Sequence, residues 1–312
     1  MARIVSLGLA TQNLYFSQPD QPFIFSSDSQ TDLQVNFSQF LPTISGGGVN
    51  SAITFARHHH ETIIISNLAN DSASSAILDL INQEDIDNSY LYFQPKTYTD
   101  TSLIFSTLIK SSTIFTYSGA SAHFSNLDPK DLNLIQPDWL YASTLNGDMN
   151  TLRHFFETAK EKNIQTMFKP GPKEFQHSKK LIGLLEDIDI LILNQSEARK
   201  IVPGHTLKEL LYRLNNYVET VIITNGVMGG IASNRRTTYR FGIYEDVKVK
   251  DSFGAGDAFG SGFLAHYATN HSLRSALIFA SANATSVITK LGSTQGILSK
   301  SASLHFMPIQ KL

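Results

Sequence analysis

Short runs of apolar residues alternate along the chain with segments in which apolar residues recur every three or four positions. The short runs predict buried β-strands, and the clearest lie at 4–7, 61–69, 189–193 and 221–224. The periodic segments predict amphipathic helices, at 51–57, 73–82, 151–162, 196–201 and 207–216. Such alternation favours an α/β fold with a doubly wound, mostly parallel sheet and helices on both of its faces.

Two stretches, at 14–44 and at about 88–117, depart from this pattern. They are rich in Phe, Tyr, Thr and Ser, and apolar and polar residues alternate in them, as in "SLIFSTLI" and "STIFTYS". This period of two predicts antiparallel strands, which we interpret as a small separate sheet inserted into a single domain of residues 1–312. A small sheet needs one face covered by the main body, by substrate or by a second copy of the chain. It is therefore a candidate lid, and a homodimer through the lid is one arrangement that would cover it.

Composition narrows the range of partners. The 25 Lys and Arg residues nearly balance the 27 Asp and Glu residues, so the net charge of −2 gives no general attraction to nucleic acid or to an anionic membrane. With 0 cysteines the chain has no disulfide or thiolate chemistry, which suits the cytoplasm. No apolar run approaches the roughly 18 residues of a membrane-spanning helix. The opening "MARIVSLGLA" is typical of a buried strand rather than a signal peptide.

The stretch "FGAGDAFG" places two glycines before an aspartate at the start of a predicted helix. Gly254 and Gly256 allow backbone conformations closed to other residues, and Ala255 is small, so backbone N–H groups can converge on one point. A helix that begins near Ala258 adds free N–H donors and a partial positive charge, which together make an anion hole. Asp257 would repel a resting phosphate there, but it could take a proton from an attacking hydroxyl, as phosphoryl transfer requires. The alternative is a glycine-rich helix start with Asp257 as its N-cap.

The segment "SGGGVNSA" suits a polyol. Gly46, Gly47 and Gly48 let the backbone approach a ligand closely, and Asn50 offers both a donor and an acceptor at the start of a helix. The segment contains no Lys or Arg, which disfavours a phosphate. A glycine-rich turn before a helix is the alternative.

Two strand ends carry polar groups that could meet a nucleotide. One strand ends at Asn194, and Glu197 follows in the first turn of a helix, so the pair could hold a hydrated Mg²⁺ with phosphates. The same spacing is also that of a capping box. In "VIITNGVMGG" a strand stops at Thr224, and Thr224 and Gly226 could meet phosphate or ribose; a glycine hairpin is the alternative.

Taken in order, these segments resemble the ribokinase-like, or PfkB, family of carbohydrate and nucleoside kinases. "DSFGAGDAFGSGF" is close to the C-terminal signature of that family, "SGGGVNSA" is a looser match to the N-terminal one, and the resemblance covers essentially the whole chain. It implies a Rossmann-like sheet with a β-lid and ATP-dependent transfer of the γ-phosphate to a hydroxyl of a small sugar. The alternatives are a nucleoside kinase that acts on an adenosine-like acceptor and a non-catalytic relative that binds nucleotide or sugar.

The resemblance also implies roles for single residues. Asp257 would be the catalytic base, and the backbone of Gly254, Ala255, Gly256 and Asp257 would be the anion hole. The residues expected to border ATP are Asn194, Thr224, Gly226, Gly229 and Asn283. Glu197 would serve Mg²⁺, while Asp251 and the backbone of 290–292 would hold a potassium ion. The residues expected to hold the acceptor are Asn13, Gly46, Gly47, Gly48 and Asn50.

The sequence departs from the family pattern at several of these positions. Asn13 stands where relatives commonly have an aspartate that binds acceptor hydroxyls, and an amide cannot give the charge-assisted bond of a carboxylate. We therefore expect weaker or different sugar recognition. Ser45 replaces a usual glycine and Phe253 a usual threonine. Lys169, where relatives often have Asn, is interpreted as a solvated charge at a strand end, with a phosphate contact as the alternative.

Overall fold

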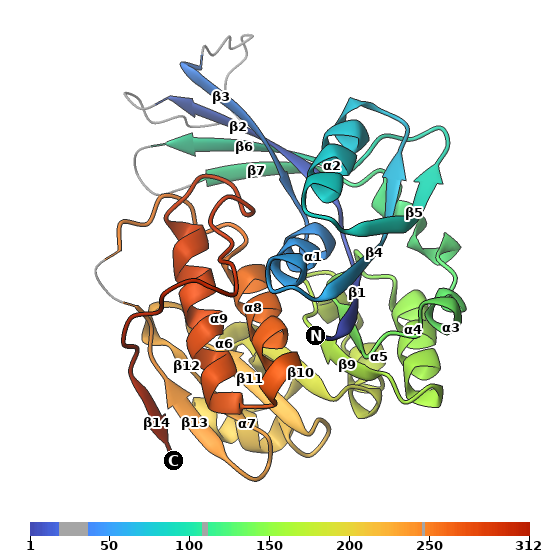
Figure 1. Ribbon diagram of the computed structural model, residues 1–312. Helices are drawn as coiled ribbons and strands as arrows, with labels where there is room; N and C mark the ends of the chain where they lie inside the picture. Colours follow the sequence, from blue (N-terminus) through green and yellow to red (C-terminus); the bar gives the residue numbers. More distant parts are fainter. Residues whose placement is uncertain (19–36, 108–111, 245–246) are drawn as a thin grey trace, which may run out of the picture.

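A computed structural model describes residues 1–18, 37–107, 112–244 and 247–312 (Figure 1), and it confirms the expected mixed α/β architecture. The strands of the large sheet lie in the order β14-β13-β12-β11-β10-β9-β8-β1-β4-β5. Their bounds are β1 Arg3–Leu7, β4 Glu61–Ala69, β5 Asp87–Gln94, β8 Trp139–Ala142, β9 Gln165–Phe168, β10 Ile190–Asn194, β11 Thr220–Thr224, β12 Gly230–Ser233, β13 Thr238–Phe241 and β14 Ile309–Lys311. The pairs from β5 to β11 are parallel, and those from β11 to β14 are antiparallel.

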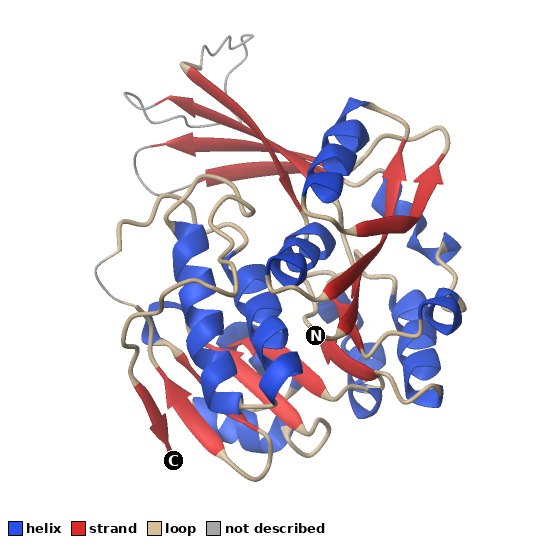
Figure 2. Cartoon of the chain, viewed as in Figure 1, coloured by secondary structure: helices blue, strands red, loops and turns tan. Residues whose placement is uncertain are grey.

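Helices cover both faces of this sheet (Figure 2). One layer contains α1 Gly47–Arg57, α2 Ser72–Gln83, α8 Ala255–Asn270 and α9 Leu273–Ile288, and the other contains α3 Asp131–Ile135, α4 Met149–Glu161, α5 Ser178–Ile182, α6 Gln195–Ile201 and α7 Leu207–Leu214. Successive residues of β4 serve different layers, because Ile63 and Ile65 belong to the core on the side of α3 to α7 while Ile64 belongs to the core with α1 and α2. This two-sided burial accounts for the continuous apolar runs of the strands.

The small sheet has the strand order β3-β2-β6-β7, with β2 Thr11–Gln18, β3 Gln39–Ser45, β6 Thr101–Thr107 and β7 Ser112–Tyr117. It rises from the body as the candidate lid (Figure 1). Residues 19–36 of the stretch expected to contribute to it lie outside the described residues. Two expectations about this sheet were wrong. β2 and β6 pair in parallel, and β5 belongs to the edge of the large sheet instead of the lid.

The pattern of β5 accounts for the second error. Tyr90 and Tyr92 pack against the core on one face of the large sheet. On the other face Leu91 packs with α1 and α2, while Ser89 and Phe93 are exposed. An edge strand whose second face is only partly covered can therefore show the same period of two as a lid strand.

Two helices begin earlier than the sequence predicts. Helix α8 begins at Ala255 rather than near Ala258, so Asp257 lies in its first turn and is not its N-cap. Its N-cap is Gly254 in the left-handed conformation, with φ 80°. Helix α1 begins at Gly47, so Asn50 also lies inside the first turn. In both helices a polar side chain, Asn50 or Asp257, therefore lies in the first turn, just after a glycine at the N-cap.

Candidate active site

Three neighbouring strands of the large sheet, β9, β10 and β11, end at one edge. Lys169 follows the last residue of β9, while Asn194 and Thr224 are the last residues of β10 and β11. Because parallel strands present their carboxyl ends at the same edge, these three side chains begin close together. Open α/β sheets bind their ligands at this edge.

Asp257 contacts two of the residues singled out above. Its Oδ1 lies 3.0 Å from Nζ of Lys169, and its Oδ2 accepts a long hydrogen bond of 3.5 Å from Nδ2 of Asn50. The side chains of Asp257 and Lys169 are each 22% exposed. The interpretation of Lys169 as a solvated charge was therefore wrong, because the carboxylate of Asp257 holds it in the site.

The orientation of Asn50 is set by a chain of hydroxyl groups. Its Oδ1 accepts a hydrogen bond of 2.9 Å from Oγ of Ser293, and Ser293 Oγ lies 2.8 Å from Oγ of Ser45. Since Oδ1 is occupied by a donor, the amide N–H₂ faces Asp257. Ser45, which departs from the family glycine, thus belongs to the network that fixes the asparagine beside the carboxylate.

The glycines around Asp257 allow close packing. A Cβ on Gly254 would lie 2.4 Å from Cβ of Ser293, and one on Gly46 would lie 2.3 Å from the carbonyl oxygen of Leu9. No side chain of the described residues caps the N-terminus of α8. The amide of Ala255 makes only a long hydrogen bond of 3.4 Å to the carbonyl of Ser252, so the first amides of the helix can still meet an anion. The N-terminus of α1 differs, because the amides of Gly48 and Val49 donate to Leu9.

Asn194 and Glu197 form a reciprocal cap on α6. Asn194 Oδ1 accepts from the amide of Glu197 at 2.9 Å, and Glu197 Oε2 accepts from the amide of Asn194 at 2.8 Å. Each side chain keeps one terminal atom outside these two bonds, Nδ2 and Oε1. The described part of the chain brings no three His, Cys, Asp or Glu residues together as a metal site. One carboxylate fits Mg²⁺ nevertheless, since that ion is usually bound by one or two carboxylates together with substrate phosphates.

The turn after β11 presents apolar side chains beside these groups. The hydroxyl of Thr224 donates to the carbonyl of Leu193 at 3.4 Å, and Val227 and Met228 are largely exposed in the short turn that follows. Gly226 adopts φ 54° with open space at its Cβ position. Gly229 is required by packing, because a Cβ there would lie 2.0 Å from the carbonyl oxygen of Phe241.

Asn283, which was expected to border the nucleotide, has a structural role in the fold. It is fully buried, its Nδ2 donates to the carbonyl of Ala258 at 2.8 Å, and its Oδ1 accepts from the amide of Leu298 at 2.8 Å. Both polar ends are used to join α9 to α8 and to the following loop. The asparagine therefore supports the helix that carries Asp257 from behind.

Asn13 lies on the face of the lid that turns toward the body. It is fully buried, and neither its Oδ1 nor its Nδ2 has a hydrogen-bond partner among the described residues. Thr43 lies directly opposite on β3, and its Oγ1 is likewise buried and unpaired within that part of the chain. Buried polar atoms are rarely left unpaired, so this pair is a marker of a ligand position.

Asp251 accepts three hydrogen bonds. Oδ2 accepts from the hydroxyl of Tyr15 at 2.6 Å and from the amide of Gly292 at 3.4 Å, and Oδ1 accepts from the amide of Phe253 at 2.9 Å. Burial and the hydrogen bond to Asp251 raise the pKa of Tyr15 well above its ordinary value, so this hydroxyl stays protonated and donates. These three donors use three of the roughly four acceptor positions of the carboxylate that was expected to bind potassium, so a cation there would compete with Tyr15 and the two amides.

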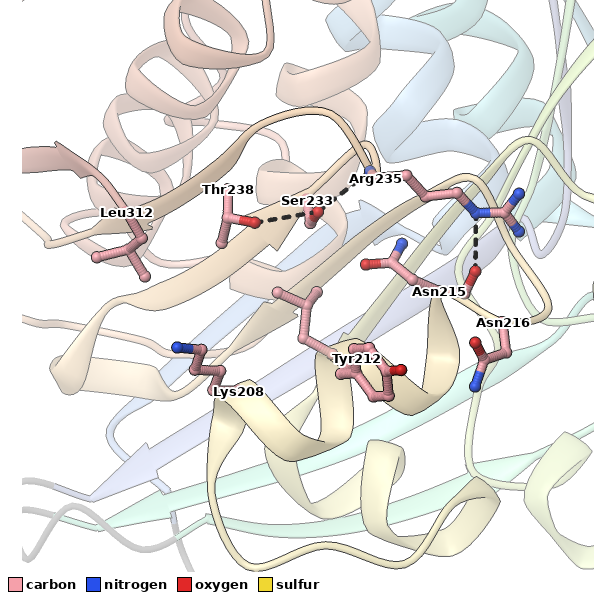
Figure 3. Close-up of a pocket in the computed structure, with 9 residues that line it drawn as sticks. Lys208, Tyr212, Asn215, Asn216, Ser233, Arg235, Thr238 and Leu312 are labelled. Atoms are coloured by element: carbon pink, nitrogen blue, oxygen red, sulfur yellow. Dashed lines mark hydrogen bonds between the residues drawn. The ribbon is translucent and has the colours of Figure 1, made fainter.

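A cavity of about 600 Å³ lies elsewhere, between α7, the β12–β13 hairpin and the C-terminus (Figure 3). The residues that line it are Lys208, Leu211, Tyr212, Asn215, Asn216, Ser233, Arg235, Thr238 and Leu312. None of the residues expected to bind acceptor or nucleotide is among them. The candidate site is thus the strand edge around Asp257, which is identified by chemistry and not by the volume of a cavity.

Comparisons with known proteins identify the fold and the family. The chain matches the family described as "pfkB family carbohydrate kinase" over residues 1–300. It is 26% identical over 271 residues to a ribokinase of Haemophilus influenzae, covering 84% of this chain and 86% of that protein. Its fold is similar to the crystal structure of a nucleoside kinase of Methanocaldococcus jannaschii, with a TM-score of 0.82, 21% identity and coverage of 95% of both chains. A ribokinase of Arabidopsis thaliana, complexed with ribose and ATP, gives a TM-score of 0.80 with 18% identity and covers 96% of both. The described residues include no helix long and apolar enough to cross a membrane.

Proposed function

Because this chain belongs to the pfkB family of carbohydrate kinases, we propose that it transfers the γ-phosphate of ATP to a hydroxyl group of a small sugar, with Asp257 as general base. The observation that carries this proposal is the position of Asp257. Its carboxylate lies in the first turn of α8, beside helix amides that no side chain caps. A protein that only bound nucleotide would gain nothing from a carboxylate beside phosphate, which disfavours the non-catalytic alternative.

The transfer follows from these groups. Asp257 accepts the proton of the acceptor hydroxyl while the hydroxyl oxygen forms a bond to the γ-phosphorus. The bond from that phosphorus to the β,γ-bridging oxygen breaks, and its electron pair leaves with ADP. The amides of Ala255, Gly256 and Asp257 donate to the phosphoryl oxygens as negative charge moves through them.

ATP would lie along the ends of β10 and β11. Asn194 Nδ2, Thr224 and the turn at Gly226 face that edge, and the exposed Val227 and Met228 offer an apolar surface to the adenine. Mg²⁺, bound by Glu197 and the phosphates, would neutralise charge on the phosphate oxygens. Since ATP is a substrate, we place the activity in the cytoplasm.

The alternation of side chains on the lid favours a sugar over a nucleoside as acceptor. Asn13, Tyr15 and Thr43 occupy the face toward the body, with the hydroxyl of Tyr15 held by Asp251. The cluster of Phe16, Phe40 and Phe105 belongs to alternate positions and therefore to the opposite face. Apart from Tyr15, these aromatic rings, which could stack on a nucleobase, lie away from the acceptor side, and the unpaired amide and hydroxyl suit a polyol.

The outward apolar face of the lid supports a second proposal, a homodimer formed through the lid. Phe40 and Leu103 are exposed on this face, and Phe115 and Tyr117 of the edge strand β7 are exposed beside them. Apolar side chains gathered on a small sheet usually meet a partner surface. A second copy of the chain brings the same surface to the contact.

The proposed activity is tested by ADP production with Mg·ATP across pentoses, hexoses, sugar acids and nucleosides, comparing wild type with Asp257→Asn. We expect turnover that depends on a sugar and falls on the order of 10²–10⁴ in kcat in the variant. Thermal melting of both proteins controls for folding. Turnover that prefers nucleosides would move the assignment to a nucleoside kinase, and unchanged kcat in a folded Asp257→Asn variant would remove Asp257 as the base.

A further inference from the structure

Lys169 packs against the glycine side of α8. A Cβ on Gly256 would lie 3.1 Å from Cε of Lys169. One on Gly260 would lie 3.5 Å from Cδ of Lys169, an ordinary contact, and 2.9 Å from the hydroxyl oxygen of Tyr141. Any other residue at 256 would press on the end of the lysine side chain. Gly256 therefore makes room for this lysine in addition to shaping the anion hole.

The backbone that follows Lys169 is fixed by a buried carboxylate. Glu174 is fully buried, and it accepts hydrogen bonds from the amides of Gly171, Leu145 and Gly147 at 2.8, 3.0 and 2.8 Å. Thr144 donates to it as well. A loop tied down in this way holds the base of the lysine side chain in one place, so the position of its ammonium group is defined by structure and not by solvent.

The charged groups that act on the pKa of Lys169 are carboxylates. Burial acts to lower the pKa of Lys169, but the carboxylate of Asp257, with smaller contributions from Glu197 and Glu174, raises it above its ordinary value. The lysine therefore remains charged at neutral pH. Asp257 is the proposed base and Glu197 the proposed metal ligand, so the ammonium group is influenced by both the acceptor side and the nucleotide side of the site.

From these contacts we propose that Lys169 is a second cationic group of the transfer site, which pairs with Asp257 in the resting protein and contacts the γ-phosphoryl oxygens during transfer. This inference rests on the proposed kinase function. An ammonium group has three donors, so it can keep its bond to Asp257 while it donates to a phosphoryl oxygen. It offsets the repulsion between the carboxylate and the incoming phosphate, and it keeps its own protons throughout, because the proton of the acceptor passes to Asp257.

The alternative is an ion pair that only stabilises the fold. The two roles can be distinguished by comparing a nucleotide that has the γ-phosphate with one that lacks it. A lysine that contacts the γ-phosphoryl group affects binding of a non-hydrolysable ATP analogue but not of ADP. A structural ion pair affects both nucleotides equally or neither.

The test compares wild type with Lys169→Met, Lys169→Arg and Lys173→Met. Lys173 is an exposed lysine of the same loop, so its replacement is a control for loss of one positive charge. Calorimetry measures binding of the Mg²⁺ complexes of the ATP analogue and of ADP. We expect Lys169→Met to weaken analogue binding about 10-fold or more and to change ADP binding less than about 2-fold. With an accepted sugar, kcat should fall by about 10²–10³, and Lys169→Arg should recover part of it.

Other results would overturn the inference or the proposed function separately. Equal changes for the analogue and ADP, or an unchanged kcat, would reduce Lys169 to a structural residue while the kinase function stands. Nucleotide binding without turnover on any acceptor would remove the proposed function, and the comparison of the two nucleotides would still decide the contact. A wild type that binds neither nucleotide would overturn both. If Lys169→Met does not fold, the same comparison is made between Asp257→Asn and Lys169→Met/Asp257→Asn, in which no carboxylate is left unpaired.

Discussion

Nζ of Lys169 lies 3.0 Å from Oδ1 of Asp257, which joins the residue after β9 to the first turn of α8. The site therefore holds balanced charge before any substrate arrives. A phosphate that enters meets the helix amides and a partly neutralised carboxylate instead of a bare negative charge. This relationship would explain how an acidic residue can stand at the proposed anion hole.

Replacement of Asn13 by leucine should stabilise the fold and weaken binding of the acceptor. Both polar atoms of Asn13 are buried and unpaired among the described residues, so an apolar side chain of similar size removes their desolvation cost. We expect Asn13→Leu to raise the free energy of unfolding by about 1 kcal/mol and to raise KM for the acceptor about tenfold, with KM for ATP unchanged. Denaturant unfolding and steady-state kinetics measure the two effects.

Gln12→Leu is the matched control, because Gln12 precedes Asn13 on β2 and belongs to the other face of the lid. It should leave acceptor KM unchanged. An Asn13→Leu variant that is less stable and binds acceptor normally would show that Asn13 supports the fold and not the acceptor.

The hydrogen bond from Tyr15 to Asp251 predicts weak dependence on potassium. The Tyr15 hydroxyl occupies Oδ2 of Asp251, so a cation gains little from this carboxylate in the wild type. Tyr15→Phe frees that oxygen, and we expect the variant to be stimulated more strongly by potassium than wild type when activity is compared in potassium and tetramethylammonium salts. Strong stimulation of the wild type would instead show that the cation displaces Tyr15 or binds elsewhere.

The buried His58 predicts loss of stability in acid. Burial, together with the nearby His60, His266 and Lys300, lowers the pKa of His58 from 6.5 to about 3. Its pKa is therefore lower in the folded than in the unfolded chain, so the unfolded chain binds the proton first as the pH falls below 6.5. The stability that depends on neutral His58 is fully present above pH 6.5 and is lost as the pH falls toward 3. Between pH 7 and pH 5 the free energy of unfolding should fall by about 2 kcal/mol.

Denaturant unfolding of wild type and His58→Gln across pH 7 to 5 measures this contribution. The variant should show a shallower pH dependence, whatever its absolute stability. His59→Asn changes the adjacent exposed histidine, which has φ 62°, to a residue that tolerates this conformation, and it should keep the wild-type slope. Equal slopes for wild type and His58→Gln would contradict the assignment.

A charge on the outer face of the lid should dissociate the proposed homodimer. Leu103 is exposed on β6, and Leu103→Glu would place like charges opposite each other across a symmetric contact. We expect light scattering to show a dimer for wild type and a monomer for this variant. Leu134→Glu, which changes an exposed leucine of α3, should remain dimeric. A monomeric wild type at micromolar concentration would exclude the lid dimer.

The large sheet could be predicted well from the sequence because its strands are buried on both faces. Ile63, Ile64 and Ile65 all point into core, and a short apolar run of this kind is typical of a central strand in a parallel sheet. The membership of β5 could not be predicted, because the side chains of an edge strand alternate in either sheet. Register and strand order depend on contacts between distant segments, which periodicity does not report.

The site was partly predictable for a similar reason. Asp257 and Asn50 belong to local patterns of glycine before a helix, and the structure brings them together. Lys169 lies alone after a strand, and the signal that could have found it is Gly256, which leaves space for the end of the lysine side chain. The backbone contacts of Asn283 could not be predicted, because a buried asparagine bonded to backbone on both sides has no local signature.

The lid strands β2 and β3, of which β3 lies at the edge of the small sheet, are joined to the body by very short connections. Only residues 8–10 separate β1 from β2, and Gly46 alone separates β3 from the helix that carries Asn50. A displacement of β3 would therefore also displace the amide that contacts Asp257. An acceptor that pulls on Asn13 and Thr43 would align the base as it docks, whereas a water molecule is too small to do so. The site would then favour a sugar over water as acceptor because only the sugar moves the lid.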